Sequence, residues 1–168
     1  MLPILHVSQI AKALGLPAPG PPPSALMAWE TVGRLQEWLE RLRPLDRATL
    51  TRPTQARGRS LLNLTVNVFH PFELLPAAWE SGRFDWDPTH DDERERALGS
   101  AEAVVAYAER IQRAWADFVV QREDELKARD PVVASSRGEL RYSELLEWQA
   151  WHVDFHRHQL DPLLESGC

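Results

Sequence analysis

Residues 59–80 form an apolar stretch, and this stretch constrains the fold more than any other feature of the 168-residue chain. Its apolar residues surround the expected helix instead of keeping to one face. They are Leu61, Leu62, Leu64, Val66, Val68, Phe69, Phe72, Leu74 and Leu75. A helix that is apolar nearly all round is usually buried on most sides. We therefore predict a buried helix over 59–80.

Three further segments carry apolar residues at helical spacing, which is the main sequence signal for a helix. They cover residues 24–43, 100–129 and 143–164. Ser24 and Ser100 precede two of them and suit the N-cap position, where a hydroxyl accepts a backbone N–H. Prolines and glycines mark a connection over 44–58, and a long acidic connection follows over 81–99.

The N-terminal segment has two parts: a short helix expected over 4–16, and then a proline-rich spacer that ends at Pro23. The first part is too small to fold alone, so we expect residues 1–23 to lie on the rest of the chain. No strand-like alternation of useful length occurs. The sequence predicts a single all-α domain over 1–168, a four-helix bundle with a short extra N-terminal helix.

Charge and cysteine content limit the partners and the compartment. The formal net charge is −6, which argues against binding nucleic acid or an anionic membrane. The one cysteine, Cys168, leaves no intramolecular disulfide and suits a reducing compartment. No basic leader or long apolar run stands out. We expect a cytoplasmic protein with a small-molecule partner, and the sequence leaves open whether it forms a homodimer.

His152 and His156 are four residues apart on the last expected helix. At that spacing their side chains leave the same face, with Cβ atoms about 5–6 Å apart. The face also carries Leu145 and Trp148, so both histidines line up with core residues. Two inward imidazoles at this spacing suit one metal ion. The alternative is that each is an ordinary hydrogen-bonded histidine of the core.

His70 lies within the most apolar stretch of the chain, directly before Pro71. Proline lacks an N–H and clashes with the carbonyl four residues earlier, so the helix should kink or restart there. An irregular backbone beside a buried histidine is compatible with a ligand position. A kink beside an incidental core histidine explains the same pattern. His90 and His158 are expected to be solvated or to point outward.

Several known types of site are excluded by spacing. The zinc-protease motif needs a Glu directly after its first histidine, whereas Val153 follows His152. Ferritin-like di-iron bundles need a histidine three residues after a glutamate, and this spacing is absent from the sequence. The chain also lacks the glycine-rich phosphate-binding patterns and the nucleophile motif of the α/β-hydrolases.

Residues 24–165 resemble the DinB-like metal-binding bundles, a superfamily that includes the maleylpyruvate isomerases and mycothiol-dependent transferases. The residues that carry the resemblance are the segment from His152 to Gln159, the lead-in over 138–143 and the segment His70-Pro71-Phe72-Glu73-Leu74-Leu75. The resemblance implies a three-histidine site of His70, His152 and His156 at one end of a four-helix bundle. It also implies zinc or nickel as the divalent metal, and in some relatives a low-molecular-weight thiol.

Three imidazoles leave a fourth metal position for water or substrate, which is the pattern of catalytic sites. Glu73, one turn from His70, is a candidate base or further ligand, and Gln159 is a candidate for orienting a ligand or a water. These features suggest a metal- and thiol-dependent S-transferase or isomerase that acts on a small electrophile. The alternative is a non-catalytic metal-binding protein of stress response or ligand sequestration.

Overall fold

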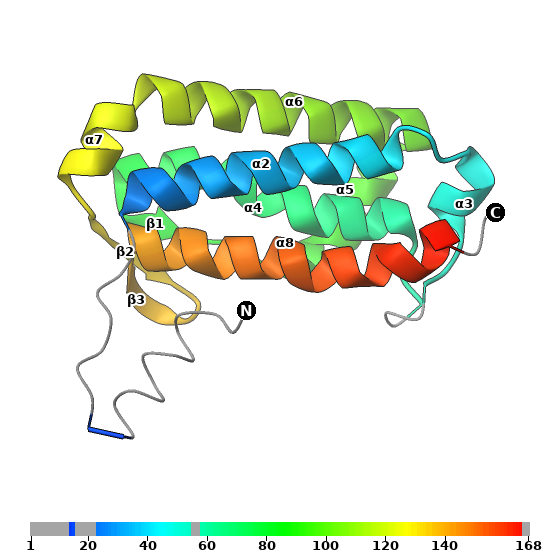
Figure 1. Ribbon diagram of the computed structural model, residues 1–168. Coiled ribbons are helices and arrows are strands. Elements are labelled where there is room, and N and C mark those ends of the chain that lie inside the picture. The colour runs from blue at the N-terminus through cyan, green and yellow to red at the C-terminus, as the bar shows by residue number, and fades with distance from the viewer. Residues whose placement is uncertain (1–13, 16–22, 55–57, 166–168) are drawn as a thin grey trace.

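The computed structural model describes residues 14–15, 23–54 and 58–165 of the chain. The longest helices among them are α2 (Ser24–Leu42), α4 (Leu61–Ser81), α6 (Ala101–Gln121) and α8 (Tyr142–Glu165). They lie side by side along one direction (Figure 1). The predicted helical architecture is confirmed. The helix expected over 4–16 falls outside the described residues, apart from a turn at Leu14 and Gly15.

Helices α2 and α8 run in the same direction. Three ion pairs join them, each between residues 120 positions apart, namely Arg34 with Asp154, Arg41 with Asp161 and Arg157 with Glu37. A constant offset of this kind occurs only between parallel elements. Helices α4 and α6 are parallel too, because Glu73 contacts Tyr107 and Glu80, further along α4, contacts Arg122, further along α6.

Two parallel helices in succession require a return along the bundle, and the acidic segment before α6 provides it. The segment contains β1 (Arg83–Phe84), the 3-10 helix η1 (Pro88–His90) and α5 (Asp91–Leu98). Helix α5 has three acidic residues in its first turn, where the helix dipole favours them. The acidic connection predicted over 81–99 therefore contains a helix that the sequence did not reveal, because its residues are mostly charged and leave no apolar stripe.

A small sheet closes the end of the bundle where α8 begins (Figure 1). Strand β1 pairs in parallel with β2 (Val132–Ser135), which pairs antiparallel with β3 (Gly138–Arg141). The expectation of no strands was wrong. The strands have two to four residues each, too short for an alternating pattern to be visible in the sequence. The short helices α3 (Arg47–Thr51) and α7 (Glu123–Ala128) complete the described elements.

Helix α4 is buried on most sides, as predicted, and it continues through Pro71 and Pro76 without restarting. The prediction for Ser100 is confirmed, since its hydroxyl accepts the N–H of Ala103 at 3.1 Å. The prediction for Ser24 as an N-cap was wrong. Ser24 is the first residue of α2, and its hydroxyl donates to Asp130 at 3.0 Å.

Large aromatic side chains fill the core, and two of the buried indoles bond to hydroxyls of other helices. The indole of Trp38 donates to Thr65 at 3.2 Å, and that of Trp115 donates to Thr31 at 3.0 Å, so that each ring joins two helices. A buried indole N–H without an acceptor costs stability, and these hydroxyls remove that cost. None of the described helices combines the length and the apolarity needed to cross a bilayer.

Candidate functional site

Helix α8 turns His152 and His156 toward the bundle interior. Their side chains are 6% and 7% exposed, and their ring centroids lie 4.8 Å apart in an edge-on arrangement. The expected inward orientation of the pair is confirmed. Trp86, from the segment after β1, covers His152 with a ring distance of 5.0 Å.

A continuous chain of buried polar groups connects His70 to His152. Nδ1 of His70 lies 2.9 Å from one carboxylate oxygen of Asp91. The other oxygen of Asp91 accepts the side-chain amide of Asn67 at 2.5 Å. The carbonyl oxygen of Asn67 lies 2.9 Å from Nε2 of His152. Asp91 and Asn67 are each 2% exposed, so all four groups are shielded from water.

This series of hydrogen bonds determines which nitrogen of each imidazole carries the hydrogen. A carboxylate only accepts, so the amide of Asn67 donates to Asp91 and its carbonyl oxygen faces His152. Nε2 of His152 must therefore donate, which leaves the lone pair on Nδ1. That nitrogen is buried and has no hydrogen-bond partner. By the same argument, His70 donates through Nδ1 to Asp91 and keeps its lone pair on Nε2.

Gln159 orients the second histidine of the pair. Its side-chain oxygen lies 2.7 Å from Nδ1 of His156, one turn earlier on α8. The oxygen accepts, so Nδ1 donates and Nε2 of His156 keeps the lone pair. The contact is the kind of orienting bond that was predicted for Gln159, although its role toward a ligand remains a prediction.

Electrostatics keep the pair uncharged near neutral pH. Burial lowers the pKa of His152 from 6.5 to about 3, and the neighbouring His156, Arg59 and Arg137 act in the same direction. Burial also lowers the pKa of His156, against an opposing effect of its bond to Gln159. Both imidazoles are therefore neutral, which is the form that binds metals.

Two cavities border the network. One, of about 290 Å³, is lined by His152 and His156 together with Arg59, Asn67, Trp86, Pro88, Phe155 and Gln159. His70 lines another cavity, of about 460 Å³, together with Asp85, Asp87, His90 and Glu93. The structure thus brings His152 and His156 together and joins His70 to them through Asp91 and Asn67. Within the described ranges, no three histidine, cysteine or acidic side chains lie close enough to hold one metal ion.

The remaining candidates lie elsewhere. Glu73 forms an ion pair with Arg94 at 2.8 Å and accepts the hydroxyl of Tyr107 at 2.9 Å, so its described contacts are with α5 and α6. The structure does not gather it with the histidines. His90 and His158 are exposed, as predicted. Cys168 lies outside the described residues.

Sequence patterns did not identify Asn67, Asp91, Arg59 and Trp86 as parts of this site. Asn67 had a visible signal, because it precedes His70 by three residues on the same helix face and is polar within an apolar stretch. Asp91 was hidden among the acidic residues at the start of α5. Arg59 and Trp86 come from connections whose position only the tertiary fold determines.

The low pKa of His152 gives a pH dependence of stability. The unfolded chain takes up a proton near pH 6.5 and the folded chain only near pH 3, so the free energy of unfolding falls as the pH is lowered through this window. The loss from this residue is about 1.4 kcal/mol per pH unit. Denaturant unfolding measures this dependence between pH 6.5 and 5 with a chelator present. The free energy of unfolding should fall less steeply with decreasing pH for His152→Gln than for the wild type. His158→Gln, at an exposed position, should match the wild type. Parallel curves for wild type and His152→Gln would contradict the assignment.

The fold and the site together define a class: a helical bundle with parallel first and last long helices and a histidine-lined cavity among them. No model of a known protein family matches the chain, and no curated protein matches it. Among solved structures, the chain is similar to the crystal structure of the mycothiol-dependent maleylpyruvate isomerase, with a TM-score of 0.60 and 14% sequence identity.

The alignment covers 83% of this chain and 61% of the isomerase chain, so this chain spans less than two thirds of that protein's length. At this level of identity the similarity concerns the fold. The shared fold is a helical bundle, as the sequence resemblance implies.

Proposed function

We propose that the chain is a metal- and thiol-dependent transferase or isomerase for a small electrophile, with the metal bound by His152, His156 and His70. The observation that carries the proposal is Nδ1 of His152, a buried nitrogen without a hydrogen-bond partner in a residue that lines a cavity. An unsatisfied buried nitrogen costs stability, and a metal ion is one group that satisfies it. The similarity to a mycothiol-dependent enzyme supports the thiol part of the proposal.

Each donor group by itself is in a form that binds a divalent metal ion, although in this structure the three imidazoles do not lie close enough together to share one. Each of the three imidazoles has one nitrogen bonded to an acceptor, and each keeps a lone pair on the other nitrogen. Metal-bound histidines usually donate their second nitrogen to a carboxylate or a carbonyl oxygen in this way. His152 and His156 are the adjacent pair, and in our proposal His70 joins them as the third ligand.

The groups of the chain have distinct parts in the proposed reaction. His152, His156 and His70 would hold the divalent ion, and such an ion would lower the pKa of a thiol so that it is available as a thiolate nucleophile. Asn67 and Gln159 hold the two imidazoles of α8 in fixed orientations. Trp86 and Phe155 line the cavity and limit the access of water to it. The cavity volume of about 290 Å³ suits a small substrate.

Cobalt provides a direct test of the thiol, because its absorption reports coordination. Protein loaded with cobalt should develop a sulfur-to-metal charge-transfer band when mycothiol, bacillithiol or glutathione is added. The Cys168→Ser variant should give the same band, since the protein's own thiol does not contribute. Fluorescence of Trp86 and Trp148, which lie near the site, should change at the same thiol concentration.

Two outcomes would count against the proposal. If imidazole or azide perturbs the cobalt spectrum and no thiol does, the metal has an open position but the thiol-dependent activity is wrong. If nothing perturbs it, the metal shell is closed. The alternative, a non-catalytic metal-binding protein, would then describe the chain better.

A further inference from the structure

A half-buried arginine at the histidine cavity has no partner of opposite charge. Arg59 lines the cavity of about 290 Å³ with His152, His156 and Gln159. Among the described side chains of residues 23–54 and 58–161, no carboxylate forms an ion pair or a hydrogen bond with its guanidinium. Arg59 is one of several described arginines without an ion pair, and its place beside two buried histidines at a cavity distinguishes it from the others.

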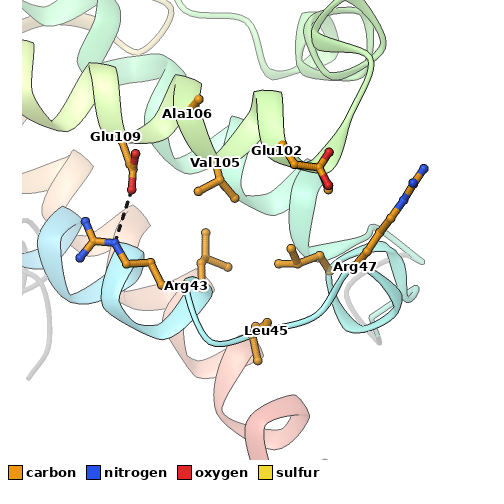
Figure 2. Close-up of a pocket in the computed structure, with 10 residues that line it drawn as sticks. Arg43, Leu45, Arg47, Glu102, Val105, Ala106 and Glu109 are labelled. Carbon is orange, nitrogen blue, oxygen red and sulfur yellow. Dashed lines mark hydrogen bonds and ion pairs between the residues drawn. The ribbon is translucent and has the colours of Figure 1, made fainter.

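A groove elsewhere on the molecule provides the comparison. It has a volume of about 350 Å³ and lies between the end of α2, α3 and the start of α6 (Figure 2). There Arg43 points at Glu109, with 3.4 Å between the paired atoms. Arg43 of that groove thus has a carboxylate partner, whereas Arg59 at the histidine cavity has none among the side chains that the structure describes.

The backbone of Arg59 is anchored, so its side chain starts from a fixed position. Its carbonyl oxygen accepts the N–H of Thr54 at 2.7 Å, which closes the connection before α4. The next residue, Ser60, caps α4 by accepting the N–H of Asn63 at 3.1 Å. Because the backbone on either side of Arg59 is already ordered, ligand binding there costs less backbone conformational entropy.

The surroundings of His152 favour negative charge. Arg59 lines the same cavity as His152, and a second cation, Arg137, stacks on Trp148 with its guanidinium carbon 4.0 Å from the ring centroid. The indole N–H of Trp86, a residue that lines the cavity, is buried and has no acceptor. An anion in the cavity would meet the guanidinium of Arg59, with a second cation and an unsatisfied donor nearby.

We propose that Arg59 binds the carboxylate of a small organic acid, as the specificity-determining residue of this cavity. The planar guanidinium matches a carboxylate with two parallel N–H···O bonds. The cavity holds about ten water volumes, enough for a short carboxylic acid. The inference rests on the proposed function, because it assigns a carboxylate either to the electrophile or to the thiol that the cavity would take.

Calorimetric titration of the full chain, treated with a chelator, tests carboxylate binding apart from metal and thiol. Succinate should bind, while succinamide, of the same shape without the charges, should not. Arg59→Gln should weaken succinate binding roughly ten- to hundredfold, the usual value of hydrogen bonds to a charged group. Arg59→Lys keeps the charge and should fall between the two. Arg43→Gln, with the same change of charge in the groove of Figure 2, should bind like the wild type.

Titrations with further ligands identify which molecule carries the carboxylate and test whether the cavity binds anions in general. If the wild type binds glutathione more tightly than glutathione diethyl ester, and Arg59→Gln binds both equally, the carboxylate belongs to the thiol. If the wild type binds glutathione and its diethyl ester equally but binds succinate tightly, the carboxylate belongs to the electrophile. Binding of succinamide as tight as that of succinate, equal binding by Arg59→Gln, or tighter binding of inorganic phosphate would each overturn the proposal. The cobalt test with thiols does not depend on Arg59, so the two proposals fail separately.

Discussion

Replacement of Asp91 by alanine is expected to lower the free energy of unfolding by about 2–6 kcal/mol. The carboxylate of Asp91 is 2% exposed and accepts from both Asn67 and His70. Without it, two buried donors lose their acceptor, at about 1–3 kcal/mol each. Relief from burying the carboxylate itself offsets part of this loss and favours the lower end of the range. Denaturant unfolding at pH 7 measures the change.

Glu93 provides the matched control for Asp91. It lies in the same first turn of α5, but it is exposed. Glu93→Ala should change the free energy of unfolding by less than about 0.5 kcal/mol. Asp91→Asn should lie between the two alanine variants, because an amide offers one acceptor where the carboxylate offers two. A loss in Asp91→Ala no greater than that in Glu93→Ala would show that the buried network contributes little.

Determination of the His152 tautomer in Asp91→Ala tests the hydrogen-bond network more specifically than stability does. In the wild type, Asn67 presents its oxygen to His152 because Asp91 takes its amide. Nitrogen chemical shifts of the imidazole should therefore show hydrogen on Nε2. In Asp91→Ala the orientation of Asn67 is no longer fixed, and both tautomers should be populated. An unchanged tautomer would mean that Asp91 does not act through Asn67.

The long helices were predictable from sequence because their apolar residues recur at helical spacing over many turns. Helix α4 was the clearest case, and its path through Pro71 shows that burial outweighs the lost hydrogen bond. The three short strands and α5 were not predictable. They are stabilised by contacts with distant segments, such as the pairing of Phe84 with Ser135, and carry little local signal.

The site was predictable in part for the same physical reason. His152 and His156 share a helix face, so their spacing determines that they lie together, and the structure agrees. The link from His70 passes through Asn67 and Asp91, and Asp91 comes from a different helix. Relations between elements depend on how the bundle closes, which no local pattern contains. Glu73 was one turn from His70 in sequence, yet it pairs with Arg94.

The proposed metal site leads to the second large effect. His152→Ala and His156→Ala should each weaken zinc or nickel binding by more than about 100-fold, because removal of a ligand costs more than removal of its orienting partner. His70→Ala tests the third ligand in the same way. His158→Ala is the control, since its side chain is 75% exposed on the same helix. Competition with a chromophoric chelator measures each affinity at pH 7, where the ligand imidazoles are neutral.

The metal content of the purified chain tests the central claim most directly. Elemental analysis after dialysis against excess zinc and removal of free ion should give about one bound ion per wild-type chain, the number that one set of three imidazoles binds. The double variant His152→Ala/His156→Ala should retain none, while circular dichroism shows that it stays folded. His158→Ala should retain the wild-type content. Equal zinc content in the wild type and the folded double variant would contradict the metal site and the function built on it.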